Sequence, residues 1–238
     1  MNDNYLKGFR IDWDKVPKDS YLQRIGALRK IDELYFDNQI TFFVGENGSG
    51  KSTLLEALAV NYGFNREGGS RNYNFSTFDE AEELKDVLTI YKAPKKYEYN
   101  YFFRAETFFN VASKENEYQK GPGGDPQYYH EKSHGEGFLH LFEKLASARG
   151  LYLFDEPEAA LSLSRQLSLF SLICKAAKRG SQFIIISHSP ILLGIPDADI
   201  FSFEEDGIKK ISYEETQSYK IMKSFIEHRQ LMIDELLK

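Results

Sequence analysis

Residues 45–52 fit the pattern G-x-x-x-x-G-K-[ST] in full, and this pattern is typical of a loop that binds phosphate. Its glycines let the backbone curl until successive N–H groups point at the anion. Lys51 is then expected to reach the β- and γ-phosphates of a nucleotide, and Ser52 to bind Mg²⁺. The predicted nucleotide-binding residues are Gly45, Glu46, Asn47, Gly48, Ser49, Gly50, Lys51, Ser52 and Thr53.

The segments on either side of this loop support the prediction. A short apolar run at 40–44 precedes the loop and is typical of a buried strand, and a helix is expected from about Ser52 to Gly63. A random chain of this length matches the pattern roughly one time in a hundred. The strand before the loop and the helix after it therefore favour a phosphate loop over a chance match. The start of the helix would place its positive dipole end against the phosphates.

Two carboxylates follow a second predicted strand, at 151–154. The carboxyl end of a parallel strand lies in the crevice where such sheets bind ligands. Asp155 is therefore predicted as a second Mg²⁺ partner. Glu156 is predicted as the base, or the residue that positions water, for attack on the γ-phosphate. A solvated acidic turn is the alternative interpretation of this pair.

Two further groups of residues could contact phosphate. Ser133, Gly135 and Glu136 precede a predicted amphipathic helix, and they are predicted to form a second anion site at its start. An ordinary helix cap is the alternative. His188 follows a third predicted strand at 183–186, and it is predicted to contact the γ-phosphate or the attacking water. A plain turn residue is the alternative there.

In this order, the phosphate loop, a Ser-x-Gly-Glu signature, an Asp-Glu strand end and a histidine resemble the ATP-binding-cassette class of P-loop ATPases. The resemblance covers about residues 20–205. It is nearest to the soluble bacterial branch related to the structural-maintenance-of-chromosomes and OLD-type ATPases, because 155–162 has the D-E-P-E-A-x-L character of that branch. Small stand-alone bacterial ATPases of the AAA family that carry S-H-G-E-G are similar in particular.

That resemblance implies an α/β fold of the ABC-ATPase type, with a mainly parallel sheet flanked by helices. It also implies a dimer in which two subunits lie head to tail and enclose two ATP molecules. Ser133 and Gly135 of one chain would contact the γ-phosphate held by Lys51 of the other. ATP would stabilise this dimer by mass action, and hydrolysis would release it.

A few positions depart from the family pattern. No glutamine lies between the phosphate loop and Gln119, so the residue that usually contacts Mg²⁺ and water is missing, and Glu106 is predicted to replace it. Ser162 stands where an aspartate is expected. The adenine contact expected upstream of the loop falls on Tyr21 or Arg24.

The elements that position these residues follow from the apolar pattern. Continuous apolar strands separated by a helix predict a parallel sheet covered on both faces. The chain is predicted to form one ATPase domain, 1–238, with an inserted helical and aromatic subdomain at about 64–132 and a C-terminal helix from Glu214. Another helix is expected at about 164–179, with an apolar face of Leu163, Leu167, Phe170, Cys174 and Ala177.

Composition narrows the class of protein. The 238 residues are 42% hydrophobic and 28% charged, which excludes wholesale disorder. The single cysteine excludes an intramolecular disulfide and a multi-cysteine metal site. No apolar run is long enough to span a bilayer, and the first ten residues lack a signal-peptide core. A cytoplasmic location without membrane insertion is therefore expected.

Two features bear on nucleic acid as a partner. The net charge of −6 argues against a surface that binds nucleic acid throughout. The aromatic run 97–103, with lysines before it, fits a surface that stacks on bases. A strand with one face in the core is the favoured interpretation. Nucleic acid stays open as a partner.

The sequence therefore predicts a protein that binds and hydrolyses ATP with Mg²⁺, forms an ATP-dependent homodimer, and switches an effector protein in DNA maintenance or phage defence. Alternatives are the energising subunit of an ABC transporter, a P-loop small-molecule kinase, and a nucleotide-gated binding module with little turnover. The missing glutamine counts against the transporter. The kinase leaves the segment at Ser133 unexplained, and a module without turnover has no need of Glu156.

Overall fold

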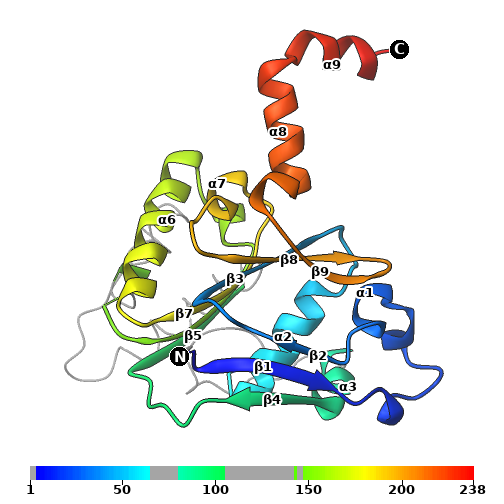
Figure 1. Ribbon diagram of the computed structural model, residues 1–238, viewed down its shortest axis with the longest axis vertical. Helices are drawn as coiled ribbons and strands as arrows, with labels where there is room; N and C mark the ends of the chain where they lie inside the picture. The colour runs from blue at the N-terminus through cyan, green and yellow to red at the C-terminus, as the bar shows by residue number, and fades with distance from the viewer. Residues whose placement is uncertain (1–3, 65–79, 105–141, 144–146) are drawn as a thin grey trace, which may run out of the picture.

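A six-stranded sheet carries the residues that the sequence singles out (Figure 1). The computed structural model describes residues 4–64, 80–104, 142–143 and 147–238. All neighbouring strands of this sheet are parallel except the last pair. In spatial order the strands are β5 (Tyr99–Arg104), β6 (Gly150–Asp155), β7 (Gln182–Ile186), β3 (Ile40–Gly45), β8 (Asp199–Glu204) and β9 (Gly207–Ile211).

The register of the parallel strands brings their carboxyl ends together. Phe43 of β3 and Asp155 of β6 both pair with Ile186, the last residue of β7. The chain leaves these strands into the phosphate loop, into Glu156 and into Ser187. Three segments that are far apart in sequence therefore start from one edge of the sheet, as the sequence predicts.

A second, antiparallel sheet packs beside the first. Its strands are β2 (Glu33–Tyr35), β1 (Leu6–Ile11) and β4 (Leu88–Lys92), in that order. The side chain of Gln182, in β7, joins the two sheets. Its Oε1 accepts from the backbone N of Leu6 at 2.8 Å, and its Nε2 donates to the carbonyl of Leu6 at 2.7 Å. Both bonds are buried, which satisfies an amide side chain that is 1% exposed.

Helices cover the main sheet on both faces (Figure 1), which confirms the predicted layers. α2 (Lys51–Tyr62) lies in the core shared with the small sheet, and it ends at Gly63, whose φ of 106° suits only glycine. α6 (Leu163–Lys178) and α7 (Pro190–Leu193) pack on the opposite face. The smaller helices are η1 (Trp13–Lys15), η2 (Tyr21–Arg24), α1 (Gly26–Arg29), α3 (Glu80–Val87) and η3 (Pro157–Ala160).

The predicted apolar face of α6 is wrong for all of its residues except Ala177, which is buried. Leu163 and Leu167 are 68% and 59% exposed, and Phe170 and Cys174 are only partly buried. Gln166 explains the difference, because its side chain donates to the carbonyl of Leu161 at 3.1 Å and fixes the rotation of the helix. The pattern treats a glutamine as a surface residue, whereas hydrogen bonds make it a core residue here. The buried face is Gln166, Leu169, Ile173, Ala176 and Ala177.

Truncation of one leucine from each side of α6 tests this assignment. Leu169→Ala is expected to lower the free energy of unfolding by about 2–5 kcal/mol, because it leaves a cavity in the core. Leu167→Ala is expected to change it by less than about 0.5 kcal/mol. Urea denaturation followed by circular dichroism measures both. Equal losses in the two variants would contradict the orientation of the helix.

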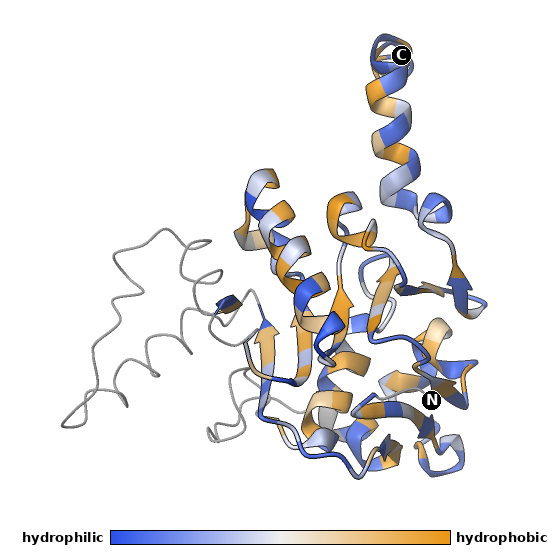
Figure 2. Ribbon diagram, turned by 60° about the vertical axis from the view of Figure 1, so that its left-hand side comes forward, coloured by the Kyte–Doolittle hydropathy of each residue, from blue (hydrophilic) through white to orange (hydrophobic). Residues whose placement is uncertain are grey.

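The C-terminal segment forms two helices rather than the one predicted from Glu214. After a short turn, η4 (Tyr213–Glu215), the chain continues as α8 (Gln217–Glu227) and α9 (Arg229–Leu236). The two meet at His228, whose φ of −131° and ψ of 37° interrupt the helix. Neither helix contains a buried residue, and the pair projects from the body with apolar residues along it (Figure 2).

The predicted insert at 64–132 is described only in part. Its residues 80–104 contribute α3, β4 and β5, and β5 belongs to the main sheet. Residues 65–79 and 105–132 lie outside the described part, so the extent of the insert stays a prediction. Tyr101 and Phe102, on opposite sides of β5, are 2% and 1% exposed. The aromatic strand is therefore buried on both faces. Within the described residues, no helix has the length and apolar content that a bilayer span needs.

Candidate functional site

The phosphate loop joins β3 to α2, and its backbone depends on glycine. Gly45, Gly48 and Gly50 have φ values of 142°, 80° and 92°, in the left-handed region. Gly50 also lies against the segment before α1, because a Cβ there would be 2.6 Å from Cγ2 of Ile25. The helix begins at Lys51, one residue before the predicted start. The last loop residue is therefore held by both conformation and packing.

A pair of alanine substitutions separates these two constraints. Gly48→Ala meets no atom within 4 Å, so only the φ of 80° counts, and we expect a loss of about 1 kcal/mol. Gly50→Ala adds a clash with Ile25, so we expect a loss of about 3 kcal/mol or more together with loss of nucleotide binding. Thermal unfolding with and without Mg-ATP measures both effects. Similar values for the two variants would show that packing at Gly50 is unimportant.

Lys51 points into the loop rather than into solvent. Lys51 is 5% exposed, and its Nζ donates to the carbonyls of Gly45 and Glu46, both at 2.7 Å. Burial lowers the pKa of Lys51, while the nearby carboxylates of Glu156 and Asp155 act in the opposite direction. The ammonium group therefore lies where the curled backbone would hold a phosphate.

The residues predicted to hold Mg²⁺ come from two elements. Ser52, in the first turn of α2, donates through Oγ to Oδ1 of Asp155 at 3.4 Å. Asp155 ends β6 and is only partly buried. No cluster of three or more His, Cys, Asp or Glu side chains that could hold a metal occurs in the described residues. A hydroxyl beside one carboxylate fits Mg²⁺, which takes few protein oxygens and completes its shell with phosphate and water.

Glu156 and His188 face each other across the ends of β6 and β7. Nε2 of His188 lies 3.9 Å from Oε1 of Glu156, and the two side chains are 45% and 47% exposed. Glu156 has a φ of 49°, which is uncommon for a residue with a Cβ. Its backbone N donates to the carbonyl of Ile186 at 3.1 Å, which helps to hold it there. Backbone strain of this kind is frequent at functional sites, where it fixes the direction of a side chain.

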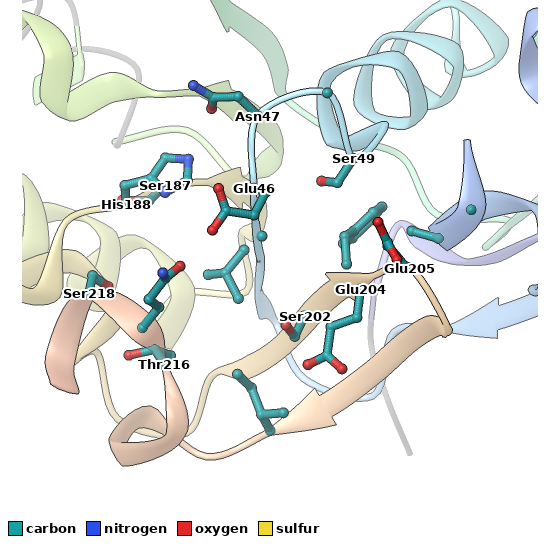
Figure 3. Close-up of a pocket in the computed structure, with 18 of the residues that line it drawn as sticks. Glu46, Asn47, Ser49, Ser187, His188, Ser202, Glu204, Glu205, Thr216 and Ser218 are labelled. Carbon is teal, nitrogen blue, oxygen red and sulfur yellow. The ribbon is translucent and has the colours of Figure 1, made fainter. Parts of the chain in front are cut away.

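A cavity of about 1080 Å³ is lined by residues 45–49 of the phosphate loop and by Glu156 and His188 (Figure 3). This volume is at the upper end of the range for small-molecule sites. Its wall comes from five parts of the chain: the phosphate loop, the ends of β6 and β7 at Glu156 and His188, residues 24–27, the β8–β9 hairpin, and the segment from Glu215 into the start of α8. The cavity therefore has room for a nucleoside triphosphate beside Glu156 and His188.

Of the two adenine candidates, only one reaches this cavity. Arg24 is among its lining residues, whereas Tyr21 packs against the hydrophobic core. Gly26 follows closely, and a Cβ on it would lie 2.9 Å from the carbonyl of Glu205 in the β8–β9 turn. This close approach forms one side of the cavity. The pattern upstream of the loop could not distinguish Arg24 from Tyr21.

Four of the predicted site residues cannot be placed. Ser133, Gly135 and Glu136 of the signature lie outside the described residues, as does Glu106, the replacement for the missing glutamine. Their roles stay predictions.

The structure also shows residues that sequence reasoning missed. The start of α8 supplies Gln217 and Lys220 to the cavity wall, although about 170 residues separate them from the phosphate loop. Glu158, two residues after Glu156, contacts the segment that carries His188. The D-E-P-E run marks that glutamate, but it does not say what the side chain contacts.

One protein family matches most of the chain. A family model described as "AAA domain" matches residues 21–235. No curated protein matches the sequence. The chain is similar to the solved SMC head domain from Thermotoga maritima, at 16% identity over 88% of this chain and 99% of that one, with a TM-score of 0.46.

Two other solved structures are similar to the same degree. One is a nucleotide-free ATP-binding cassette from an ABC transporter, at 17% identity over 92% of this chain and 95% of that one, with a TM-score of 0.49. The other is an SmcHead bound to the C-winged helix domain of ScpA, at 16% identity over 92% of this chain and 100% of that one, with a TM-score of 0.48. All three TM-scores lie below 0.5, so the family model carries the assignment.

Proposed function

The chain belongs to the AAA domain family, and from that premise we propose that it binds Mg-ATP in the cavity at the carboxyl ends of β3, β6 and β7 and hydrolyses it. One observation carries the proposal. Residues 45–49 of the phosphate loop and the Glu156 and His188 pair line one cavity, and Asp155, the residue before Glu156, accepts a hydrogen bond from Ser52 in the turn that follows the loop. That set supplies what phosphoryl transfer to water requires, because such catalysis depends on positioning and on charge stabilisation.

Each residue has a role that fits its position. The loop amides and Lys51 hold the β- and γ-phosphates, and Ser52 and Asp155 are the residues that would hold Mg²⁺, which supplies charge neutralisation at the phosphates. Glu156 accepts a proton from water while the water oxygen bonds to the γ-phosphorus. The bond from that phosphorus to the bridging oxygen breaks, and ADP leaves. His188 contacts the γ-phosphate or the attacking water.

The dimer is the second part of the proposal. Ser133 and Gly135 of one chain would complete the site around the γ-phosphate bound to the other, so the two chains would associate only with ATP present. The support is the order of motifs along the chain, which resembles that of the ATP-binding-cassette class. Such a dimer would act as a switch for an effector protein, in DNA maintenance or phage defence.

Phosphate release from the purified chain tests the hydrolysis step. With Mg-ATP and no added acceptor, we expect steady release of inorganic phosphate that stops when EDTA removes Mg²⁺. Phosphate transfer that requires a small-molecule acceptor would favour the kinase. Turnover that appears only with a membrane protein partner would favour the transporter subunit. Bound ATP with no turnover under any of these conditions would favour the gated binding module.

A further inference from the structure

A polar network connects the segment after β6 to the segment after β7, and none of its members has a role in the proposal above except His188. At its centre, Oε1 of Glu158 accepts three hydrogen bonds. The donors are Oγ of Ser187 at 2.9 Å, the backbone N of His188 at 2.5 Å and the backbone N of Ser189 at 3.2 Å. One carboxylate oxygen therefore holds three consecutive residues.

The network continues into the core. Oγ of Ser189 donates to Oε1 of Gln166 at 2.6 Å and accepts from the first N–H groups of α7. Gln166 in turn donates to the carbonyl of Leu161, on the segment that also contains Glu158. Ser187, Ser189 and Gln166 are all less than a tenth exposed. Buried networks of this kind fix one arrangement of the backbone when their members are satisfied.

The contacts of Glu158 satisfy only one of its two carboxylate oxygens. Its second carboxylate oxygen, Oε2, is buried and has no hydrogen-bond partner among the described residues. Burial raises the pKa of Glu158, and the hydrogen bonds from the His188 loop only partly oppose this. As the pH rises through that raised pKa, ionisation of Glu158 therefore costs folding free energy. A buried carboxylate with one unpartnered oxygen is typical of a site with a functional constraint.

The position of Glu158 indicates what that constraint is. Glu158 does not line the cavity, and its Oε1 is directed toward the segment that carries His188. It contacts His188 through the backbone only, which leaves the imidazole free toward the cavity (Figure 3). Glu158 also lies in the same turn as Glu156, whose carbonyl accepts from the backbone N of Ala159 at 3.1 Å. The Glu158 carboxylate thus holds the backbone of His188, and it belongs to the same turn as Glu156, the residue that faces His188 across the site.

We propose that Glu158 is a positioning residue that holds the backbone of His188 so that its imidazole stays opposite Glu156. The proposal rests on the proposed function for its catalytic meaning, because Glu156 and His188 take their roles from it. A shift of about 1 Å at a reacting centre lowers a rate about 100-fold, so a loose His188 loop would show in kcat. The KM for ATP would change little, since the phosphate loop is not part of the network.

The kinetic test compares Glu158→Ala with Glu158→Gln. Alanine removes the shared acceptor of three donors, and we expect kcat to fall at least about tenfold while KM stays within about threefold. Glutamine keeps a carbonyl oxygen for the same donors, and we expect it to retain at least about half of the wild-type kcat. Leu169→Ala, which loosens the core without touching the Glu158 contacts, is the matched control and should keep its kcat.

Two outcomes would overturn the proposal. A wild-type kcat in Glu158→Ala would show that the loop does not need the carboxylate. Equal losses in the alanine and glutamine variants, together with a loss in Leu169→Ala of the same size, would mean that only general stability is involved. Should Glu158→Ala fail to fold, Glu158→Asp replaces it, because its shorter side chain cannot reach all three donors.

A readout without turnover separates this proposal from the proposed function. The imidazole Cε1–H signal of His188, assigned by its absence in His188→Gln, reports on the position of the ring by NMR. We expect it to shift or broaden in Glu158→Ala and to stay at its wild-type position in Glu158→Gln. An unchanged signal in both variants would sink the positioning role. If the variants show this pattern of NMR signals but the wild-type protein releases no phosphate, the positioning role stays intact and the proposed ATPase activity is contradicted.

Discussion

Lys51→Ala is expected to weaken ATP binding at least about 100-fold, which corresponds to about 3 kcal/mol. The ammonium of Lys51 is buried in the phosphate loop and donates to two loop carbonyls. A charged donor in this position makes hydrogen bonds to phosphate that are each worth about 1.5–3 kcal/mol. Alanine removes the only positive side chain of residues 45–53, and the loop carbonyls then face the anion without a cation between them.

Ligand-dependent thermal unfolding measures this change. Wild-type protein at an ATP concentration about 100 times its Kd should gain about 2.7 kcal/mol, and Lys51→Ala should gain almost nothing. Lys92→Ala is the matched control, because Lys92 donates to the carbonyls of Asn61 and Tyr62 at the other end of α2. It should keep the full ATP-dependent gain. Unchanged ATP affinity in Lys51→Ala would contradict the assignment of the loop.

Local patterns predicted the elements that carry the site, and the reason is physical. β3, β6 and β7 are continuous apolar runs, and a strand buried on both faces has that pattern whatever its neighbours are. The glycines of the phosphate loop require positive φ values, which restricts the residue type at each position. Conformational requirements of this kind involve only neighbouring residues, so they can be recognised from a single sequence.

Contacts between distant segments were not predictable in the same way. Periodicity ranks positions by apolar character, so it placed Leu167 on the apolar face of α6, whereas the structure exposes Leu167 and buries Gln166. Hydrogen bonds to the Leu161 carbonyl and from Ser189 keep the Gln166 side chain in the core, and no local pattern contains the partner Ser189. The same holds for the start of α8 in the cavity wall and for the bonds from the His188 loop to Glu158.

Glu156→Gln is expected to lower the rate of ATP hydrolysis about 100- to 10,000-fold and to leave ATP binding unchanged. Glutamine has nearly the same shape as glutamate, but its neutral amide cannot accept a proton from water. The Glu156 side chain is about half exposed, and its carboxylate accepts no hydrogen bond from the described residues, so the substitution removes little else. Phosphate release and ATP affinity, measured on the same preparation, check the two halves of this expectation. Wild-type turnover in the variant would end the catalytic role of Glu156.

The same variant gives the sharpest test of the dimer, because ATP stays bound in it. We expect its molar mass in solution to be 27.5 kDa without nucleotide and to double with Mg-ATP. Ser133→Arg in the Glu156→Gln background is the control, since a bulky cation at the signature should block association while each chain still binds one ATP. A doubled mass in that control would remove the signature from the interface. A monomer under both conditions in Glu156→Gln would mean that ATP does not join two copies of this chain, and a kinase-like use of the phosphate loop would then explain the cavity better.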